Sequence, residues 1–175
     1  MDPVLSIRNL SLDFATPEGP VHALRKVNFD VPRNHIVGIV GESGSGKSTV
    51  ISAAMRLLAN NAVIRSGEVM FNGRDILCLS PQELRALRGE QISMVFQDPM
   101  TSQIPVHTIG KQMTDIQYRR STTSMGEKRR LAIDMLRRVG ISDPEERLTQ
   151  YPHQFSGGMR QRISIAMALL MNPQL

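Results

Sequence analysis

The sequence predicts an α/β fold made of antiparallel strands, one strand, loop and helix unit, and a C-terminal half that is mainly helical. Alternating apolar residues predict antiparallel strands in the first third of the chain. A short apolar run at 36–40 precedes a glycine-rich turn and a helical pattern, and after residue 98 the apolar spacing is mainly helical. With 175 residues, 41% hydrophobic and 21% charged, the chain has the length and composition of one folded soluble domain.

Composition excludes several classes of protein. The net charge of +5 comes from scattered arginines, with two tyrosines and no tryptophan, so we expect no nucleic-acid partner. Cys78 is the single cysteine, which rules out a disulfide framework, and we expect a buried or half-buried structural thiol. No signal peptide is visible at the N-terminus, and the longest nearly apolar run, 163–171, is too short to span a bilayer. We therefore expect a cytoplasmic chain that reaches the membrane through protein partners.

The expected strands follow from alternation and turn chemistry. Residues 5–14 alternate with a phase slip near Asn9, which predicts a bulged strand, and residues 27–31 predict an antiparallel partner. Residues 68–71 lead into Asn72-Gly73, the pair that suits a type I′ hairpin turn. The apolar runs 36–40 and 92–96 predict two further strands, the first of them buried and parallel.

The expected helices follow from apolar spacing and capping residues. One runs over 47–58, and a short one begins at the capping box Ser80 to Glu83 and ends near Gly89. A third covers 124–139, closed by Gly140, with its basic cluster (Lys128, Arg129, Arg130, Arg137, Arg138) as a solvated face. A fourth starts at Ser156 and is apolar nearly all round over 163–171, so we expect it to be buried.

Residues 41–49 match the phosphate-binding pattern G-x-x-x-x-G-K-[ST], known as Walker A, in the required place between a strand and a helix. The residues are Gly41, Glu42, Ser43, Gly44, Ser45, Gly46, Lys47, Ser48 and Thr49. Backbone N–H groups can cradle phosphates here, Lys47 reaches the β and γ phosphates, and the Ser48 hydroxyl can ligate Mg²⁺. The alternative is a chance glycine-rich turn. Kinases, GTPases and motor ATPases share this loop, so it predicts ATP binding without naming the work that the nucleotide drives.

A second candidate anion site lies at 156–158, where a serine and two glycines open a helix. Taken alone, this pattern is as well explained by an ordinary helix cap. Segment 151–162 resembles the ABC signature motif LSGGQ, with Phe155 for the usual leucine and Met159 for the usual first glutamine. Together with the phosphate loop and the intervening segment 96–99, it resembles the ABC ATPase family over essentially the whole chain.

The resemblance implies a P-loop NTPase core with an antiparallel β subdomain and a helical subdomain, the C-terminal part of the core being missing. Residues 1–175 would be one incomplete ABC nucleotide-binding domain. About 1–97 would form the β subdomain and P-loop core, and about 98–175 the helical subdomain.

The resemblance also implies roles for residues outside the phosphate loop. Gln97 would contact Mg²⁺ and the attacking water, with a plain polar strand end as the alternative. Phe14 would stack on adenine, unless it is a simple core residue. The signature residues Ser156, Gly157, Gly158 and Gln161 would act in trans on the ATP of a second subunit.

Three sequence segments, 40–48, 96–102 and 151–154, resemble those of the dipeptide, oligopeptide and nickel importer ATPases. Two departures stand out. Gln103-Ile104-Pro105 replaces the usual Leu-Asn-Pro, which affects the loop toward the permease, and Asn34-His35 replaces the usual Gly-Glu. Neither removes a phosphate contact, and asparagine tolerates left-handed geometry better than most residues.

Hydrolysis in this family needs a Walker B strand ending in aspartate and glutamate, and a later switch histidine; this chain ends before both, so no catalytic residue is assigned. His22, His35, His107 and His153 all precede the switch position and are expected at the surface or in turns. Without the later strands, edges and apolar faces stay exposed, so we expect a marginal or aggregation-prone isolated chain.

The favoured function is the ATP-binding subunit of a bacterial ABC importer, peripheral on the cytoplasmic side of the inner membrane. Its partners would be a second ABC ATPase subunit, two transmembrane permeases and a periplasmic or extracellular substrate-binding protein. The alternative is a non-catalytic fragment that binds nucleotide but cannot hydrolyse it alone. A soluble ABC ATPase of translation or DNA repair is less well supported, because neither a paired second domain nor a coiled-coil insertion is visible.

Overall fold

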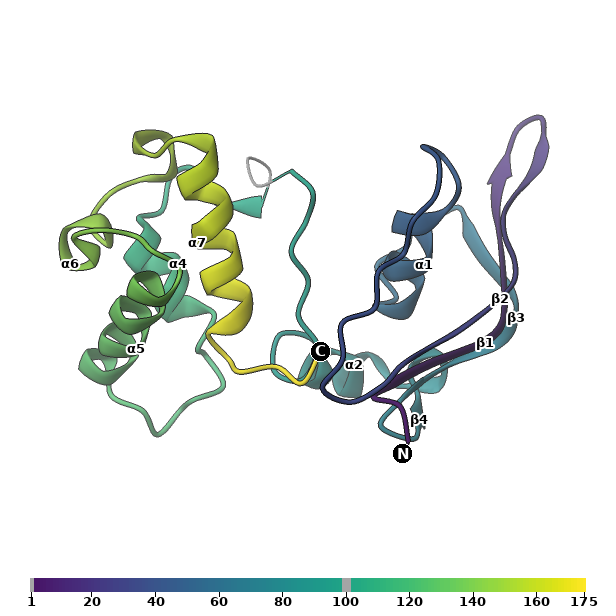
Figure 1. Cartoon of the computed structure of the whole chain (residues 1–175), viewed down its shortest axis with the longest axis horizontal. Helices are drawn as coiled ribbons and strands as arrows, with labels where there is room; N and C mark the ends of the chain where they lie inside the picture. The colour runs from purple at the N-terminus through teal and green to yellow at the C-terminus, as the bar shows by residue number, and fades with distance from the viewer. Residues whose placement is uncertain (1, 99–101) are drawn as a thin grey trace. The chain divides into compact units, whose positions relative to one another are not determined.

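A computed structural model describes residues 2–98 and 102–175 of the chain. The chain forms two compact units, Met1–Arg85 and Ala86–Leu175, and each is described by itself (Figure 1). The predicted subdomain boundary near residue 97 stays a prediction.

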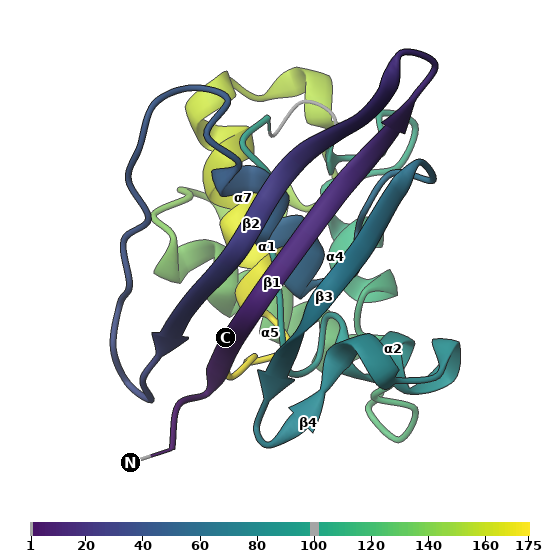
Figure 2. The same cartoon turned by 90° about the vertical axis from the view of Figure 1, so that its right-hand side faces the viewer.

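The first unit is built on a four-stranded antiparallel sheet in the order β2-β1-β3-β4. Its strands are β1 (Leu5–Thr16), β2 (Gly19–Val31), β3 (Ala62–Phe71) and β4 (Arg74–Asp75), and Figure 2 shows the three long ones side by side. Ile7, Leu10 and Leu12 of β1 are fully buried, and the two residues between Ile7 and Leu10 are exposed, so the apolar residues of the alternating pattern form the core of the sheet. The antiparallel reading of this part of the sequence is confirmed.

A β-bulge interrupts β1, as the phase slip near Asn9 predicts. The pairing with β2 and β3 shifts register just after this point, and Asn9 has a left-handed φ of 48°. Gly67 on β3 faces the bulge with φ 106°, and a Cβ there would lie 2.5 Å from the Cα of Leu10. Only glycine lets the two strands approach this closely.

The hairpin and the capping box are also confirmed. Asn72 and Gly73 have φ values of 48° and 76°, the left-handed pair of a type I′ turn between β3 and β4. After the short helix η1 (Ile76–Cys78), the Ser80 N–H donates to the Glu83 carboxylate at 2.9 Å, and the Glu83 N–H donates to the Ser80 hydroxyl at 3.3 Å. Helix α2 (Pro81–Leu87) begins there.

Helix α1 (Lys47–Ala54) lies against one face of this sheet (Figures 1 and 2). Val50, Ala53 and Ala54 are its buried residues. The prediction of a helix as far as residue 58 is wrong, because Arg56 turns left-handed with φ 49° and breaks the helical pattern.

The second unit is a group of helices: α4 (Ile109–Asp115), α5 (Met125–Arg138), α6 (Pro144–Arg147), η2 (Pro152–Gln154) and α7 (Gly157–Leu169). They share one apolar core, formed by Ile109, Met113, Ala132, Leu136, Ile141, Leu148, Phe155, Ile163, Ala166 and Leu170. Ser124 and Ser156 are the N-caps of α5 and α7, and Gly140 closes α5 with φ 74°, as predicted.

Two expectations for these helices meet different outcomes. The basic cluster of α5 is largely exposed, and Arg137 pairs with Asp134 and Glu145, as expected for a solvated face. The expectation that α7 is buried all round is wrong in part, because Leu169 is 47% exposed. Only one stripe of α7 faces the core of this unit.

The two predicted strands 36–40 and 92–96 are absent from the described residues, and these predictions are wrong for this structure. Ile36 is 101% exposed, Val40 93% and Phe96 49%. Ile92 forms only an isolated bridge with Arg88. A strand that is buried on both faces needs a neighbouring strand on each side. Residues 36–40 pair with no strand among the residues described. The run 92–96 bonds to residue 175 through the Ser93 N–H, which donates to the Leu175 carbonyl at 2.9 Å, without forming a strand ladder.

Cys78 is exposed, so the expectation of a buried or half-buried thiol is also wrong. Its Sγ lies 3.2 Å from the Asp75 carboxylate, and this hydrogen bond raises the pKa of the thiol. The thiolate, which is the reactive form, is thereby disfavoured.

Within the described ranges, no helix has the length and apolar character needed to cross a membrane. In the same part of the chain, no group of three or more histidine, cysteine, aspartate or glutamate residues could hold a metal ion.

We predict that replacing both Ile36 and Val40 with threonine raises the soluble fraction of the 175-residue chain and leaves its melting temperature unchanged, because both side chains are already exposed. Sedimentation and melting followed by circular dichroism would measure the two effects. Leu10→Ala, at a fully buried position, is the control and should cost about 2–5 kcal/mol. A sharp, reversible melt of a monomeric wild-type chain would contradict the expected tendency to aggregate.

Candidate functional site

The candidate phosphate loop leads directly into α1. Gly46 is the N-cap of α1, with a left-handed φ of 89° and no side-chain cap. A Cβ on Gly46 would lie 3.0 Å from both the carbonyl oxygen of Ala23 and Cδ2 of Leu24, so glycine lets the loop rest directly on β2. No acidic residue lies in the first turn of α1, which leaves the positive end of the helix dipole uncompensated.

The Lys47 ammonium is held inside the same loop. Its Nζ donates to the carbonyl oxygens of Gly41 at 2.8 Å and Glu42 at 2.5 Å, and to the Ser45 hydroxyl at 3.3 Å. The Ser48 side chain is exposed and that of Thr49 half-buried. The loop therefore gathers a cation, a hydroxyl and a helix N-terminus, which are the groups that bind anions in proteins.

Phe14, the candidate adenine-stacking residue, lies on β1 between Val21 of β2 and Ala62 of β3. Its side chain is half-buried, so a part of the ring surface is available to a ligand.

Asp13, next to Phe14, carries an ion-pair cluster that the sequence did not reveal. The His22 Nδ1 donates to its carboxylate at 2.7 Å from β2, and the Arg65 Nε donates at 2.9 Å from β3. These hydrogen bonds hold the pKa of Asp13 below its usual value, and the bond from His22 has the larger effect, followed by the bond from Arg65. Aspartate is uncommon in strands, so its presence at position 13 was the sequence signal that could have indicated a charged partner.

Gln97 lies in an exposed bend of the second unit. Of the segment 96–102 that supports the importer resemblance, Pro99, Met100 and Thr101 lie outside the described residues.

The signature residues begin α7. The Ser156 hydroxyl accepts a hydrogen bond from the Met159 N–H at 3.4 Å, and a Cβ on Gly157 or Gly158 would meet no atom within 4 Å. Gln161 is also exposed. With no acidic residue in its first turn, this helix start has the open space and the positive dipole end of an anion site.

The two departures from the signature consensus have a structural reason. Phe155 is 5% exposed and belongs to the core of the helical unit, and Met159 packs partly against that core. Both are apolar anchors that hold the start of α7 in place, a role that the usual leucine can also fill.

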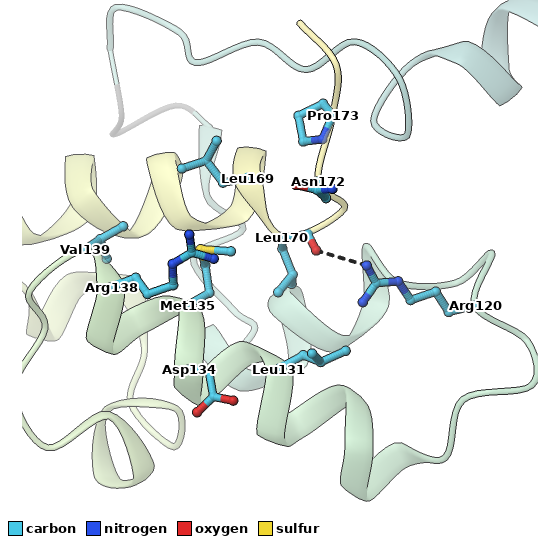
Figure 3. A pocket seen from close by; sticks show the side chains of 10 residues that line it. All are labelled: Arg120, Leu131, Asp134, Met135, Arg138, Val139, Leu169, Leu170, Asn172 and Pro173. Carbon is cyan, nitrogen blue, oxygen red and sulfur yellow. Dashed lines mark hydrogen bonds between the residues drawn. The ribbon is translucent and has the colours of Figure 1, made fainter. Parts of the chain in front are cut away.

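A groove of about 570 Å³ lies between α5 and the C-terminal end of α7 (Figure 3). Leu131 and Met135 line it from α5, and Arg120 donates across one end to the Leu170 carbonyl at 3.3 Å. The 13 residues of α7 span roughly 20 Å, and Ser156 precedes the opposite end of the helix. This groove is therefore separate from the signature residues.

The ABC transporter family model matches residues 24–175, and the chain belongs to this family. It is 47% identical over 176 residues to the dipeptide transport ATP-binding protein DppD of Bacillus subtilis, and 47% identical over 174 residues to the oligopeptide transport ATP-binding protein OppD of Escherichia coli. The alignments cover 100% and 99% of this chain, and 52% and 51% of the relatives. The chain thus spans about half the length of these curated relatives.

Solved structures agree with the family. A dimeric post-hydrolysis state of the ATP-binding cassette MJ0796 bound to ADP and Pi matches with a TM-score of 0.84 and 29% identity, covering 97% of this chain and 70% of that chain. CbiO1 from Clostridium perfringens, part of the ABC transporter complex cbiONQ, matches with a TM-score of 0.77 and 26% identity, covering 99% and 63%. The chain has the ABC ATPase fold class that its sequence predicts.

We predict that Asp13→Asn flattens the dependence of stability on pH in acid. In the wild type, the lowered pKa of Asp13 contributes stability that is fully present above the pKa of an unfolded aspartate, about 3.9. This contribution is lost as the pH falls through the lower pKa of the folded state. Urea unfolding at several pH values below about 4 would measure it. Glu18→Gln, at an exposed turn, is the control, and a wild-type slope in Asp13→Asn would contradict the prediction.

Proposed function

We propose that this chain is the ATP-binding part of a bacterial ABC importer subunit for peptides. One observation carries the proposal: the Gly41–Thr49 loop starts α1 with an open helix N-terminus and holds the Lys47 ammonium inside the loop. The relatives named for dipeptide and oligopeptide transport support the substrate class. Binding of phosphate oxygens would replace the Gly41 and Glu42 carbonyls as acceptors for Lys47.

Mg²⁺ would be held by the Ser48 hydroxyl together with phosphate oxygens, and the role of Gln97 as a second Mg²⁺ contact rests on the family resemblance alone. These are hard oxygen donors, which Mg²⁺ prefers, and both side chains are exposed. The bound ion would neutralise phosphate charge and orient the nucleotide. Phe14 would supply one face for the adenine ring.

The signature residues Ser156, Gly157, Gly158 and Gln161 would contact the ATP of a second ABC subunit. Their open surroundings and the uncompensated helix dipole support this role. The further partners would be two permeases and an extracytoplasmic substrate-binding protein, with this chain peripheral on the cytoplasmic side of the inner membrane. The division into a nucleotide-binding part, about 1–97, and a helical part, about 98–175, belongs to the same proposal.

We predict that Lys47→Ala weakens ATP binding by roughly 10-fold to 100-fold, the range that corresponds to losing one charged hydrogen-bonding partner. Titration with a fluorescent ATP analogue in the presence of Mg²⁺ would measure the dissociation constant. Lys111→Ala is the matched control, because Lys111 is an exposed lysine that pairs with Asp115 in α4. An unchanged dissociation constant in Lys47→Ala would count against the phosphate loop.

The alternative function is a non-catalytic fragment that binds nucleotide but does not hydrolyse it. A measurement of ATP hydrolysis distinguishes the two functions. In the printed sequence no apolar run ends in Asp-Glu, the pair that in this family positions Mg²⁺ and activates water. We therefore expect the pure chain to release phosphate no faster than its Lys47→Ala variant. Turnover that Lys47→Ala abolishes would reject the fragment and establish an active ATPase.

A further inference from the structure

Gln103 is buried against α7, with 5% of its surface exposed. Its Nε2 donates to the carbonyl oxygen of Arg160 at 2.9 Å and to the Ser164 hydroxyl at 3.2 Å. Both acceptors belong to α7, within its first two turns after Ser156. The Ser102 and Ser164 hydroxyls also lie 3.2 Å apart. Residues 102 and 103 are thus joined to α7 by side-chain hydrogen bonds.

Gln112 of α4 holds the other side of the same segment. Its Oε1 accepts from the Ile104 N–H at 2.9 Å, and its Nε2 donates to the carbonyl oxygens of Ile104 at 3.0 Å and His107 at 2.9 Å. Ile104 and Val106 contribute little packing, because they are 49% and 74% exposed. Residues 102–107 are therefore fixed between α4 and α7 mainly by two buried amides.

Apolar packing does not explain a glutamine at position 103. In the described part of the chain, its Oε1 is buried without a hydrogen-bond partner, which is unfavourable. Reversing the amide would set this oxygen against the Arg160 carbonyl, so the observed orientation keeps both bonds to α7. The leucine usual at this point in the importer ATPases would pack without donating. The bonds to α7 are what this chain gains from the exchange.

We propose that Gln103 is a positioning residue that connects residues 102–107 to α7 at Arg160 and Ser164. A displacement of residues 102–103 then pulls directly on the Arg160 carbonyl and moves Ser156 and Gly158 with it. This role rests on the proposed function, in which Gln97 and the signature residues serve the nucleotide.

Hydrogen exchange of the 175-residue chain, followed by mass spectrometry, tests the connection without nucleotide. Gln103→Met keeps the length of the side chain and removes its donors. We expect it to raise exchange of residues 157–164 roughly fivefold, the change for one ordinary hydrogen bond, and to leave 125–138 unchanged. Gln82→Met, at an exposed glutamine of α2, is the matched control.

Ser164→Ala completes a double-mutant cycle with Gln103→Met. Because the two side chains share a hydrogen bond, the double variant should raise exchange of residues 157–164 by less than the sum of the two single effects, compared as free energies. Fully additive effects would overturn the proposal. Exchange rates in Gln103→Met that equal those of the wild type would also overturn it. So would an equal rise over residues 125–138, because Gln103 would then only stabilise the whole unit.

A second arm adds Mg²⁺ and ATP. In the wild type, we expect nucleotide to change the exchange rate of residues 93–98 and also that of residues 157–164. In Gln103→Met, the change at 157–164 should disappear, while the ATP dissociation constant stays the same. Retention of both changes in the variant would overturn the proposal. If nucleotide fails to protect 41–49, the proposed function fails, while the nucleotide-free comparison still decides the role of Gln103.

Discussion

The close approach of Gly46 to β2 is the constraint on which the candidate phosphate loop depends. A Cβ at this position would lie only 3.0 Å from the Ala23 carbonyl oxygen and Cδ2 of Leu24, and its φ of 89° is strained for any residue but glycine. Because the loop can rest on the strand, α1 starts directly over the sheet and buries Val50 and Ala53 there. The first N–H groups of α1 have no intrahelical acceptor and no side-chain cap, which leaves them available to an anion at the loop.

Both candidate anion sites are helix starts, but they are built differently. Ser156 caps α7 with its own hydroxyl, whereas α1 has no side-chain cap and its loop is organised around the Lys47 ammonium. Binding of phosphate at the α1 site would therefore exchange internal acceptors for external ones, and its net free energy would be smaller than the gross strength of the new bonds. At α7 the glycines stand in open space, so an approaching phosphate meets no side chain.

Local patterns predicted the elements whose stabilising contacts are near in sequence. The type I′ pair Asn72-Gly73, the capping box at Ser80 and the cap at Ser156 were read correctly, because each depends on a few neighbouring residues. Asn34 belongs to the pair Asn34-His35, which replaces the usual Gly-Glu before the phosphate loop. It adopts a left-handed φ of 60°, which asparagine tolerates. The runs 36–40 and 92–96 were predicted as strands and are not, because apolar character does not supply the hydrogen-bonding neighbours that a strand requires.

The sequence by itself determined the family and predicted the candidate phosphate loop and signature turn, since these depend on glycine, serine and lysine at set spacings along the chain. Only the tertiary structure decided which buried polar groups meet. Asp13 joins His22 and Arg65 across three strands, and Gln103 reaches Arg160 and Ser164 on α7. Spacing cannot reveal such contacts, because their partners lie far apart in the chain and come together only when the backbone folds.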